Sequence, residues 1–95
     1  MTKMIILSFL QEHKAEMKEK FGLTKIGLFG SYAKDTATEE SDIDFVIETE
    51  KKDFFLREDL KTYLEKSFNK TVDIGYIDSF RNFYKKKIEQ EIVYV

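Results

Sequence analysis

The sequence lacks several residue types, and each absence narrows the possible functions. It has no cysteine, no proline and no tryptophan, and only one histidine among its 95 residues. Without cysteine there can be neither a disulfide framework nor a thiolate zinc site, which is consistent with a reducing compartment. No apolar stretch approaches the roughly 20 residues that span a bilayer, and the run from Met4 to Leu7 is too short for a signal-peptide core. We therefore expect a cytoplasmic protein that does not bind a membrane.

The charged residues show no excess of one sign. Sixteen Lys and Arg residues stand against 18 Asp and Glu residues, and the net charge is −2. Proteins that bind nucleic acid through its phosphates usually carry a strongly basic face. The basic run at residues 85–87 would spread around a helix instead of forming such a face. We therefore expect no direct binding of nucleic acid.

Length and composition predict one domain over residues 1–95. No repeat, low-complexity tract or interdomain linker interrupts the chain. The hydrophobic fraction is 42%, with nine Phe and five Tyr residues, which is enough for one compact core of modest size.

Hydrophobic spacing predicts helices that alternate with strands. Apolar residues at intervals of three and four predict helices over residues 3–20, 56–68 and 80–91, the last with Asp78-Ser79 as its N-cap. Short apolar or alternating runs predict strands over residues 25–29, 42–48, 71–77 and 92–95. The loop between the first two strands is too short for a helical crossover, so we expect antiparallel or mixed pairing. The predicted fold is α+β, with helices packed on one small sheet.

Two carboxylates stand at the head of the second predicted strand. Asp42 and Asp44 are two residues apart, so their side chains leave the same face of the strand, with Cα atoms about 6.5–7 Å apart. Carboxylates at this separation are suited to flank one Mg²⁺ ion or a pair of ions, whose other ligands are waters and substrate phosphates. An Asp pair at a strand entrance is also ordinary turn chemistry, so the pair alone leaves both interpretations open.

Gly30 and Ser31 end the first predicted strand in a tight turn. A glycine here lets the backbone turn sharply and approach a ligand closely, and the backbone N–H groups of such a turn form a concavity for an anion. Ser31 adds a hydroxyl donor. A plain strand-ending turn also fits these two residues when they are considered alone. Antiparallel pairing would place this turn at the same end of the sheet as Asp42, and the combination points to a nucleoside triphosphate.

The ordered combination resembles the signature of the minimal nucleotidyltransferase family, in the DNA polymerase β-like superfamily. That signature is Gly-Ser, about ten residues, and Asp-x-Asp. The matching segments are residues 28–33, Leu-Phe-Gly-Ser-Tyr-Ala, and residues 41–47, Ser-Asp-Ile-Asp-Phe-Val-Ile. Residues 70–74, Lys-Thr-Val-Asp-Ile, resemble the strand that carries the family's third carboxylate. The resemblance covers residues 24–95 and implies a polymerase β-like nucleotidyltransferase core.

The resemblance implies roles for particular residues. Gly30 and Ser31 would hold the outer phosphates of the nucleotide. Asp42 and Asp44 would bind two Mg²⁺ ions, and Asp73 would complete the carboxylate set at the metals and assist the attacking hydroxyl. An ordinary surface position remains the alternative for Asp73.

Other positions near the signature either match the family or depart from it. Lys34 stands where a basic residue is usual, and we expect it to face the triphosphate. Tyr32 replaces a common Arg, and Asp35 replaces a common Gly and adds negative charge near the phosphates. His13 lies on the apolar stripe of the first predicted helix, where a structural role is expected.

The resemblance also implies an activity and a partner. It implies a Mg²⁺-dependent nucleotidyltransferase that moves AMP from ATP to a hydroxyl, on tyrosine, of a HEPN-type toxin, so that this chain acts as the antitoxin in a hetero-oligomer. One alternative is a non-catalytic binding module that neutralises its partner by contact. Another is adenylylation of a small molecule.

Overall fold

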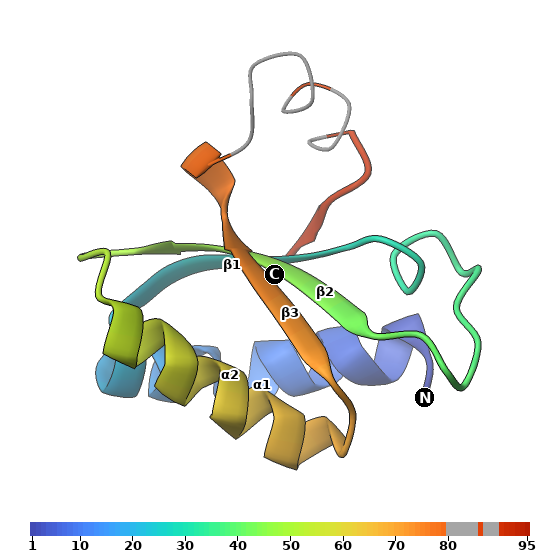
Figure 1. Cartoon of the computed structure of the whole chain (residues 1–95), viewed down its shortest axis with the longest axis horizontal. Helices are drawn as coiled ribbons and strands as arrows, with labels where there is room; N and C mark the ends of the chain where they lie inside the picture. The colour runs from blue at the N-terminus through green and yellow to red at the C-terminus, as the bar shows by residue number, and fades with distance from the viewer. Residues whose placement is uncertain (80–85, 87–89) are drawn as a thin grey trace.

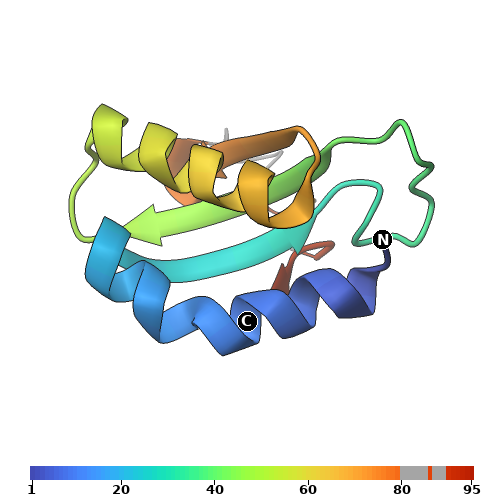
Figure 2. The same cartoon turned by 90° about the horizontal axis from the view of Figure 1, so that it is seen from below.

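The computed structural model describes residues 1–79, 86 and 90–95 and shows helices packed on one face of a mixed sheet (Figure 1). Helices α1 and α2 lie side by side and run in opposite directions beneath the sheet (Figure 2). The third helix, expected over residues 80–91, falls largely outside the described residues. In the part of the chain that is described, neither α1 nor α2 is long and apolar enough to cross a membrane.

Helix α1 (Lys3–Phe21) confirms the first predicted helix and has a defined cap at each end. The Thr2 hydroxyl accepts a hydrogen bond from the backbone N–H of Ile5 at 3.2 Å. At the other end Gly22 has a φ of 67°, and its N–H donates to the Lys18 carbonyl at 3.0 Å. This left-handed C-cap favours glycine. The buried side chains of α1 follow the predicted spacing and are Ile6, Leu10, Met17 and Phe21.

Helix α2 (Phe54–Phe68) begins two residues before the predicted boundary. The Asp53 carboxylate accepts hydrogen bonds from the N–H groups of Phe55 at 2.8 Å and Leu56 at 3.1 Å. These bonds satisfy donors that have no partner inside the helix. The first turn carries the exposed side chains of Phe54 and Phe55, which lie off the apolar stripe, so hydrophobic spacing does not detect it. Asn69 ends the helix with a φ of 53°.

Replacing Asp53 by alanine is expected to destabilise the fold by about 1 kcal/mol, because α2 loses its N-cap. The measurement is the free energy of unfolding from urea denaturation. The control is Asp59→Ala, which removes an exposed carboxylate from the helix interior and should change stability by less than about 0.5 kcal/mol. Equal losses for the two variants would contradict the assigned cap.

The sheet has the strand order β3-β2-β1-β4. Its strands are β1 (Leu23–Phe29), β2 (Ile43–Thr49), β3 (Val72–Tyr76) and β4 (Val93–Tyr94). Strand β1 is antiparallel to both β2 and β4, whereas β2 and β3 are parallel and are connected through α2. The mixed sheet with helices on it confirms the predicted fold class. A 3₁₀ turn (Ile77–Ser79) follows β3.

The two faces of the sheet have different roles. The side chains of Ile43, Phe45 and Ile47 belong to the core cluster that includes the buried residues of α1 and α2. Asp44 and Val46 alternate with them and therefore project from the opposite face. On that face a Cβ at Gly27 would collide with Ile92 and lie 2.9 Å from Cδ1 of Tyr94. The absence of a side chain at Gly27 therefore leaves room over β1 for the side chains of Ile92 and Tyr94.

Candidate active site

Strand register brings the predicted site residues to one end of the sheet. Phe29, the residue before Gly30, is paired with Asp44 on the antiparallel strand. Asp44 is in turn paired with Asp73 on the parallel strand β3. Asp44 and Asp73 therefore stand side by side on the face away from the helices, and Asp42 lies just before β2. Three carboxylates and the Gly-Ser turn thus lie at the same end of the sheet.

The backbone of Gly30 packs directly against the carboxylate of Asp44. Gly30 has a φ of 75°, a conformation that residues with side chains rarely adopt. A Cβ at this position would collide with Oδ2 of Asp44 and would lie 3.1 Å from its Cγ. Both the backbone angle and the lack of space therefore require glycine. The turn and the carboxylate form one packed unit, although Gly30 and Asp44 come from different strands.

The carboxylates repel one another. Partial burial raises the pKa of Asp44 above its ordinary value, and the negative charges of Asp73 and Asp42 raise it further. Asp42 and Asp73 are exposed, and Asp44 is partly buried. The charges of Asp42 and Asp73 therefore act on Asp44, and a bound cation would relieve the repulsion.

The carboxylate oxygens at this end of the sheet suit Mg²⁺. This ion takes carboxylate oxygens as ligands and completes its coordination with waters and phosphate oxygens. No group of three or more His, Cys, Asp or Glu side chains within the described residues is arranged to hold a metal ion. Asp42, Asp44 and Asp73 supply carboxylates of the chemical kind that such an ion binds. Their negative charges repel one another, but their carboxylate oxygens do not converge on a common point.

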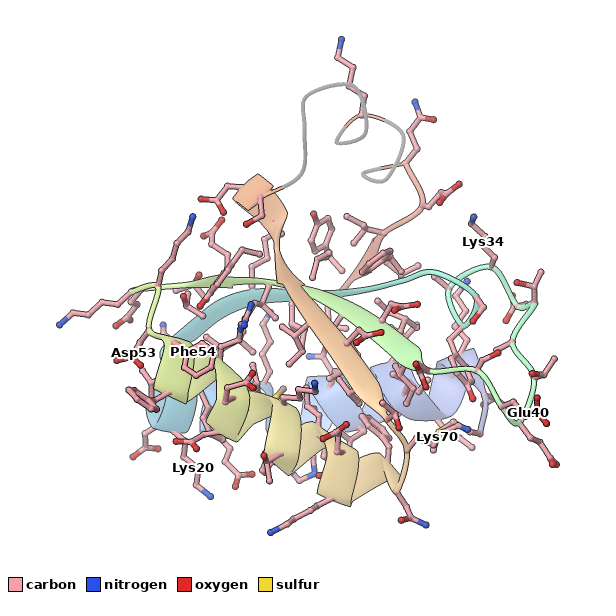
Figure 3. All side chains as sticks on the ribbon, in the orientation of Figure 1. Lys20, Lys34, Glu40, Asp53, Phe54 and Lys70 are labelled. Carbon is pink, nitrogen blue, oxygen red and sulfur yellow. The ribbon has the colours of Figure 1, made fainter. Side chains whose placement is uncertain are left out.

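The loop after Gly30 is held by short backbone contacts. The N–H of Lys34 donates to the Gly30 carbonyl at 3.2 Å, and the N–H of Thr36 donates to the Ser31 carbonyl at 2.9 Å. The Lys34 ammonium, about half exposed, forms an ion pair with Glu91 at 3.2 Å. Figure 3 shows Lys34 on this loop, pointing away from the helix layer. Lys34 therefore lies beside the Gly-Ser turn, but its charge faces a carboxylate of the C-terminal segment.

The two departures from the family pattern occupy defined places. Tyr32 is 4% exposed and belongs to the hydrophobic core, so it anchors the loop instead of facing a ligand. Asp35 has a φ of 60°, in the left-handed region that favours glycine. Its carboxylate lies 3.9 Å from the ammonium of Lys3. The loop thus keeps a backbone conformation typical of Gly at position 35 while carrying Asp there.

His13 has the structural surroundings that its position on α1 predicts. Its Nδ1 lies 3.0 Å from Oε2 of Glu16, and its ring lies 4.2 Å from that of Phe9. Hydrogen bonds from Lys20 first, and then from His13, lower the pKa of Glu16 to about 2. This polar cluster belongs to the helix layer, on the other side of the sheet from Asp44 and Asp73.

One contact at the candidate site was missed by sequence reasoning. The ammonium of Lys70 donates a hydrogen bond of 2.7 Å to the backbone carbonyl of Glu39. A backbone acceptor leaves no trace in side-chain identity, so the sequence contains no signal for this pair.

Comparisons with known proteins identify the family. Residues 10–95 match the family model described as nucleotidyltransferase domain. The protein adenylyltransferase MntA of Thermococcus cleftensis is 37% identical over 91 residues, which cover 95% of this chain and 92% of that protein. A Methanocaldococcus jannaschii protein assigned as a protein adenylyltransferase is 40% identical over 96 residues, covering 95% of this chain and 94% of that protein.

Solved structures share the fold at lower sequence identity. A structure assigned as a minimal nucleotidyltransferase has a TM-score of 0.81 at 22% identity and covers 98% of this chain and 95% of its own. A toxin–antitoxin crystal structure with AMP-PNP has a TM-score of 0.70 at 22% identity and covers 88% of this chain and 70% of its own. The match over residues 10–95, together with these relatives, shows that the chain belongs to the nucleotidyltransferase domain family.

Proposed function

We propose that this chain transfers AMP from ATP to a hydroxyl, on tyrosine, of a HEPN-type partner toxin, and thereby acts as its antitoxin. The observation that carries the proposal is the packing of the Gly30 turn against Asp44, beside Asp73. This packing supports a site in which an anion-binding turn lies against a set of carboxylates. A triphosphate with its metal needs both features at the same place.

The relatives support the acceptor class. The Thermococcus protein is named a protein adenylyltransferase, and it aligns with nearly the whole of this chain. A chain with the same fold occurs in the toxin–antitoxin crystal structure with AMP-PNP, which supports a role for this fold in such a complex. A protein acceptor also fits the exposure of Asp42 and Asp73.

Each residue has a distinct task in the proposed reaction. The backbone of Gly30 and the hydroxyl of Ser31 bind the outer phosphates, and Lys34 turns from Glu91 to the triphosphate when the nucleotide binds. Asp42, Asp44 and Asp73 would hold two Mg²⁺ ions, which would neutralise charge on the phosphates. Asp73 orients the acceptor hydroxyl and takes up its proton. The acceptor oxygen forms a bond to the α-phosphorus as the bond to the leaving pyrophosphate breaks.

The proposal predicts a covalent change in the partner. The proposed HEPN-type partner toxin is incubated with the chain, Mg²⁺ and each nucleoside triphosphate in turn, and its intact mass is measured. We expect a gain of one or more AMP units with ATP and no gain without Mg²⁺. Tandem mass spectrometry should then locate AMP on a tyrosine.

Matched variants separate this enzyme from the alternatives. The double variant Asp42→Asn, Asp44→Asn should leave the partner's mass unchanged and the partner toxic. If this variant still neutralises the toxin and the wild-type chain adds no mass with any nucleotide, the chain acts by contact alone. Turnover of free small acceptors in the absence of partner would instead indicate a small-molecule adenylyltransferase.

A further inference from the structure

We propose that Lys70 is a positioning residue that fixes the loop between β1 and β2 relative to β3, and so sets the distance between Asp42 and Asp73. The proposal rests on the proposed function for its catalytic consequence, whereas its structural part stands on the contacts alone. Residues 30–42 form this loop, which the following paragraphs call the phosphate loop.

The phosphate loop has two halves with separate internal bonds. The first half is the turn that follows Gly30. In the second half the N–H of Thr38 donates to the Ser41 hydroxyl at 2.9 Å, and the N–H of Ser41 donates to the Thr38 carbonyl at 3.1 Å. Neither set of bonds attaches the second half to the rest of the domain. Its side chains at Thr38, Glu39 and Glu40 are exposed.

Lys70 supplies the attachment. Its ammonium donates to the Glu39 carbonyl at 2.7 Å and lies 5.9 Å from the centre of the Tyr32 ring. Tyr32 is buried, and its hydroxyl lies 3.5 Å from the Thr38 carbonyl. One cation therefore contacts the return half of the loop and also lies over the ring that anchors its first half. Figure 3 shows Lys70 just before β3, pointing toward the part of the loop that carries Glu40.

The position of this contact gives it a role at the site. Glu39 lies three residues before Asp42, and Lys70 lies three residues before Asp73. The N–H of Ile43 donates to the Thr71 carbonyl at 3.1 Å, so the backbone ladder between β2 and β3 begins just beyond the Lys70 contact. The Lys70 contact thus joins the segment before β2 to the segment before β3, beyond the point where the backbone hydrogen bonds between these strands end. Without it, within the described part of the chain, the segment before Asp42 would be held only by β2 and by the hydrogen bond from the Tyr32 hydroxyl to the Thr38 carbonyl.

The test compares variants of the full chain by two independent measurements. Lys70→Met keeps the aliphatic length and removes the donor, and Lys70→Arg keeps a cationic donor. Lys66→Met is the control, because Lys66 is an exposed lysine in the last turn of α2. Amide hydrogen exchange is measured without nucleotide or metal, and kcat and KM for ATP are measured for AMP transfer to the partner. Lys70→Gln serves if Lys70→Met does not fold.

We expect Lys70→Met to raise the exchange rates of the Thr38 and Ser41 amides roughly tenfold, while the core amides of β1 and β2 are unchanged. We expect kcat to fall on the order of 10- to 100-fold with KM for ATP changed less than about threefold, because misplaced reacting groups slow the chemical step. Lys70→Arg should restore both measurements, and Lys66→Met should match wild type.

Two results would overturn the inference. One is unchanged exchange at Thr38 and Ser41 in Lys70→Met, and the other is a loss of activity that Lys70→Arg does not restore. A wild-type chain that transfers no AMP would refute the proposed function instead. In that case the exchange measurement alone decides whether Lys70 holds the phosphate loop.

Discussion

Replacing Asp44 by asparagine is expected to abolish AMP transfer while leaving the fold at least as stable as wild type. The central carboxylate is lost, and with it several kcal/mol of charge stabilisation at the phosphates, so the rate should fall by more than roughly 100-fold. Stability should not fall, because asparagine has the same shape and carries no charge beside Asp42 and Asp73. The measurements are partner mass gain per unit time and the melting temperature.

The pH dependence of stability gives a second measurement on the same variant. Because the folded state raises the pKa of Asp44 above its ordinary 3.8, ionisation of this group costs stability. The cost is absent below the unfolded pKa, grows as pH rises toward the folded pKa and is fully present above it. The melting temperature of Asp44→Asn should therefore exceed that of wild type near neutral pH, and the difference should vanish below about pH 3.8.

Magnesium provides a control that does not depend on activity. Mg²⁺ binds the folded state, so it should raise the melting temperature of wild type and have a much smaller effect on Asp44→Asn. Asp59→Asn, which neutralises an exposed carboxylate on α2, should respond to Mg²⁺ as wild type does. Transfer by Asp44→Asn at a rate within a few-fold of wild type would show that Asp44 is not part of the reaction.

Replacing Gly30 by alanine should damage both stability and activity. The new Cβ meets Oδ2 of Asp44, and the positive φ of Gly30 is unfavourable for alanine by about 1–2 kcal/mol. The collision adds about 1–3 kcal/mol, unless the turn moves away from the carboxylate and spoils the phosphate site. We expect a free energy of unfolding lower by about 2–5 kcal/mol and AMP transfer lower by more than roughly 100-fold.

Gly22 offers a matched control, because it has a similar φ of 67° and nothing within 4 Å of the position its Cβ would take. Gly22→Ala therefore measures the backbone cost alone, and the excess loss in Gly30→Ala measures the collision. The collision is then tested by a double-mutant cycle. Gly30→Ala should be less destabilising in the Asp44→Ala background than in wild type. Equal losses in both backgrounds would mean that the two residues do not pack together.

The fold was predictable from the sequence wherever buried residues recur at the spacing of a helix or of a strand. The apolar stripe of α1 and the alternation in β2 fixed the type of these elements and their bounds to within one or two residues. The first turn of α2 was missed because Phe54 and Phe55 are exposed and the turn depends on the Asp53 cap. Strand order is a non-local property, so the sequence limited the sheet to antiparallel or mixed pairing without giving its order.

The candidate site was predictable as a set of residues but not as a set of contacts. Gly30, Asp44 and Asp73 could be predicted because the residue type alone gives the property that matters, which is backbone freedom for glycine and negative charge for aspartate. The register that pairs Asp44 with Asp73, and the ion pair of Lys34 with Glu91, join segments far apart in the chain. Tyr32 stood out only as a departure from the family pattern, and its burial in the core depends on the turn after Gly30.

The contact between Lys70 and the phosphate loop has a consequence for how such proteins diverge. Lys70 binds a main-chain oxygen, which is the same whatever amino acid stands at position 39. Substitutions at the exposed positions 39 and 40 can therefore accumulate without loosening the loop. Under the proposed function, this rim of the domain could change its shape and charge to suit a different acceptor while the carboxylates stay in register.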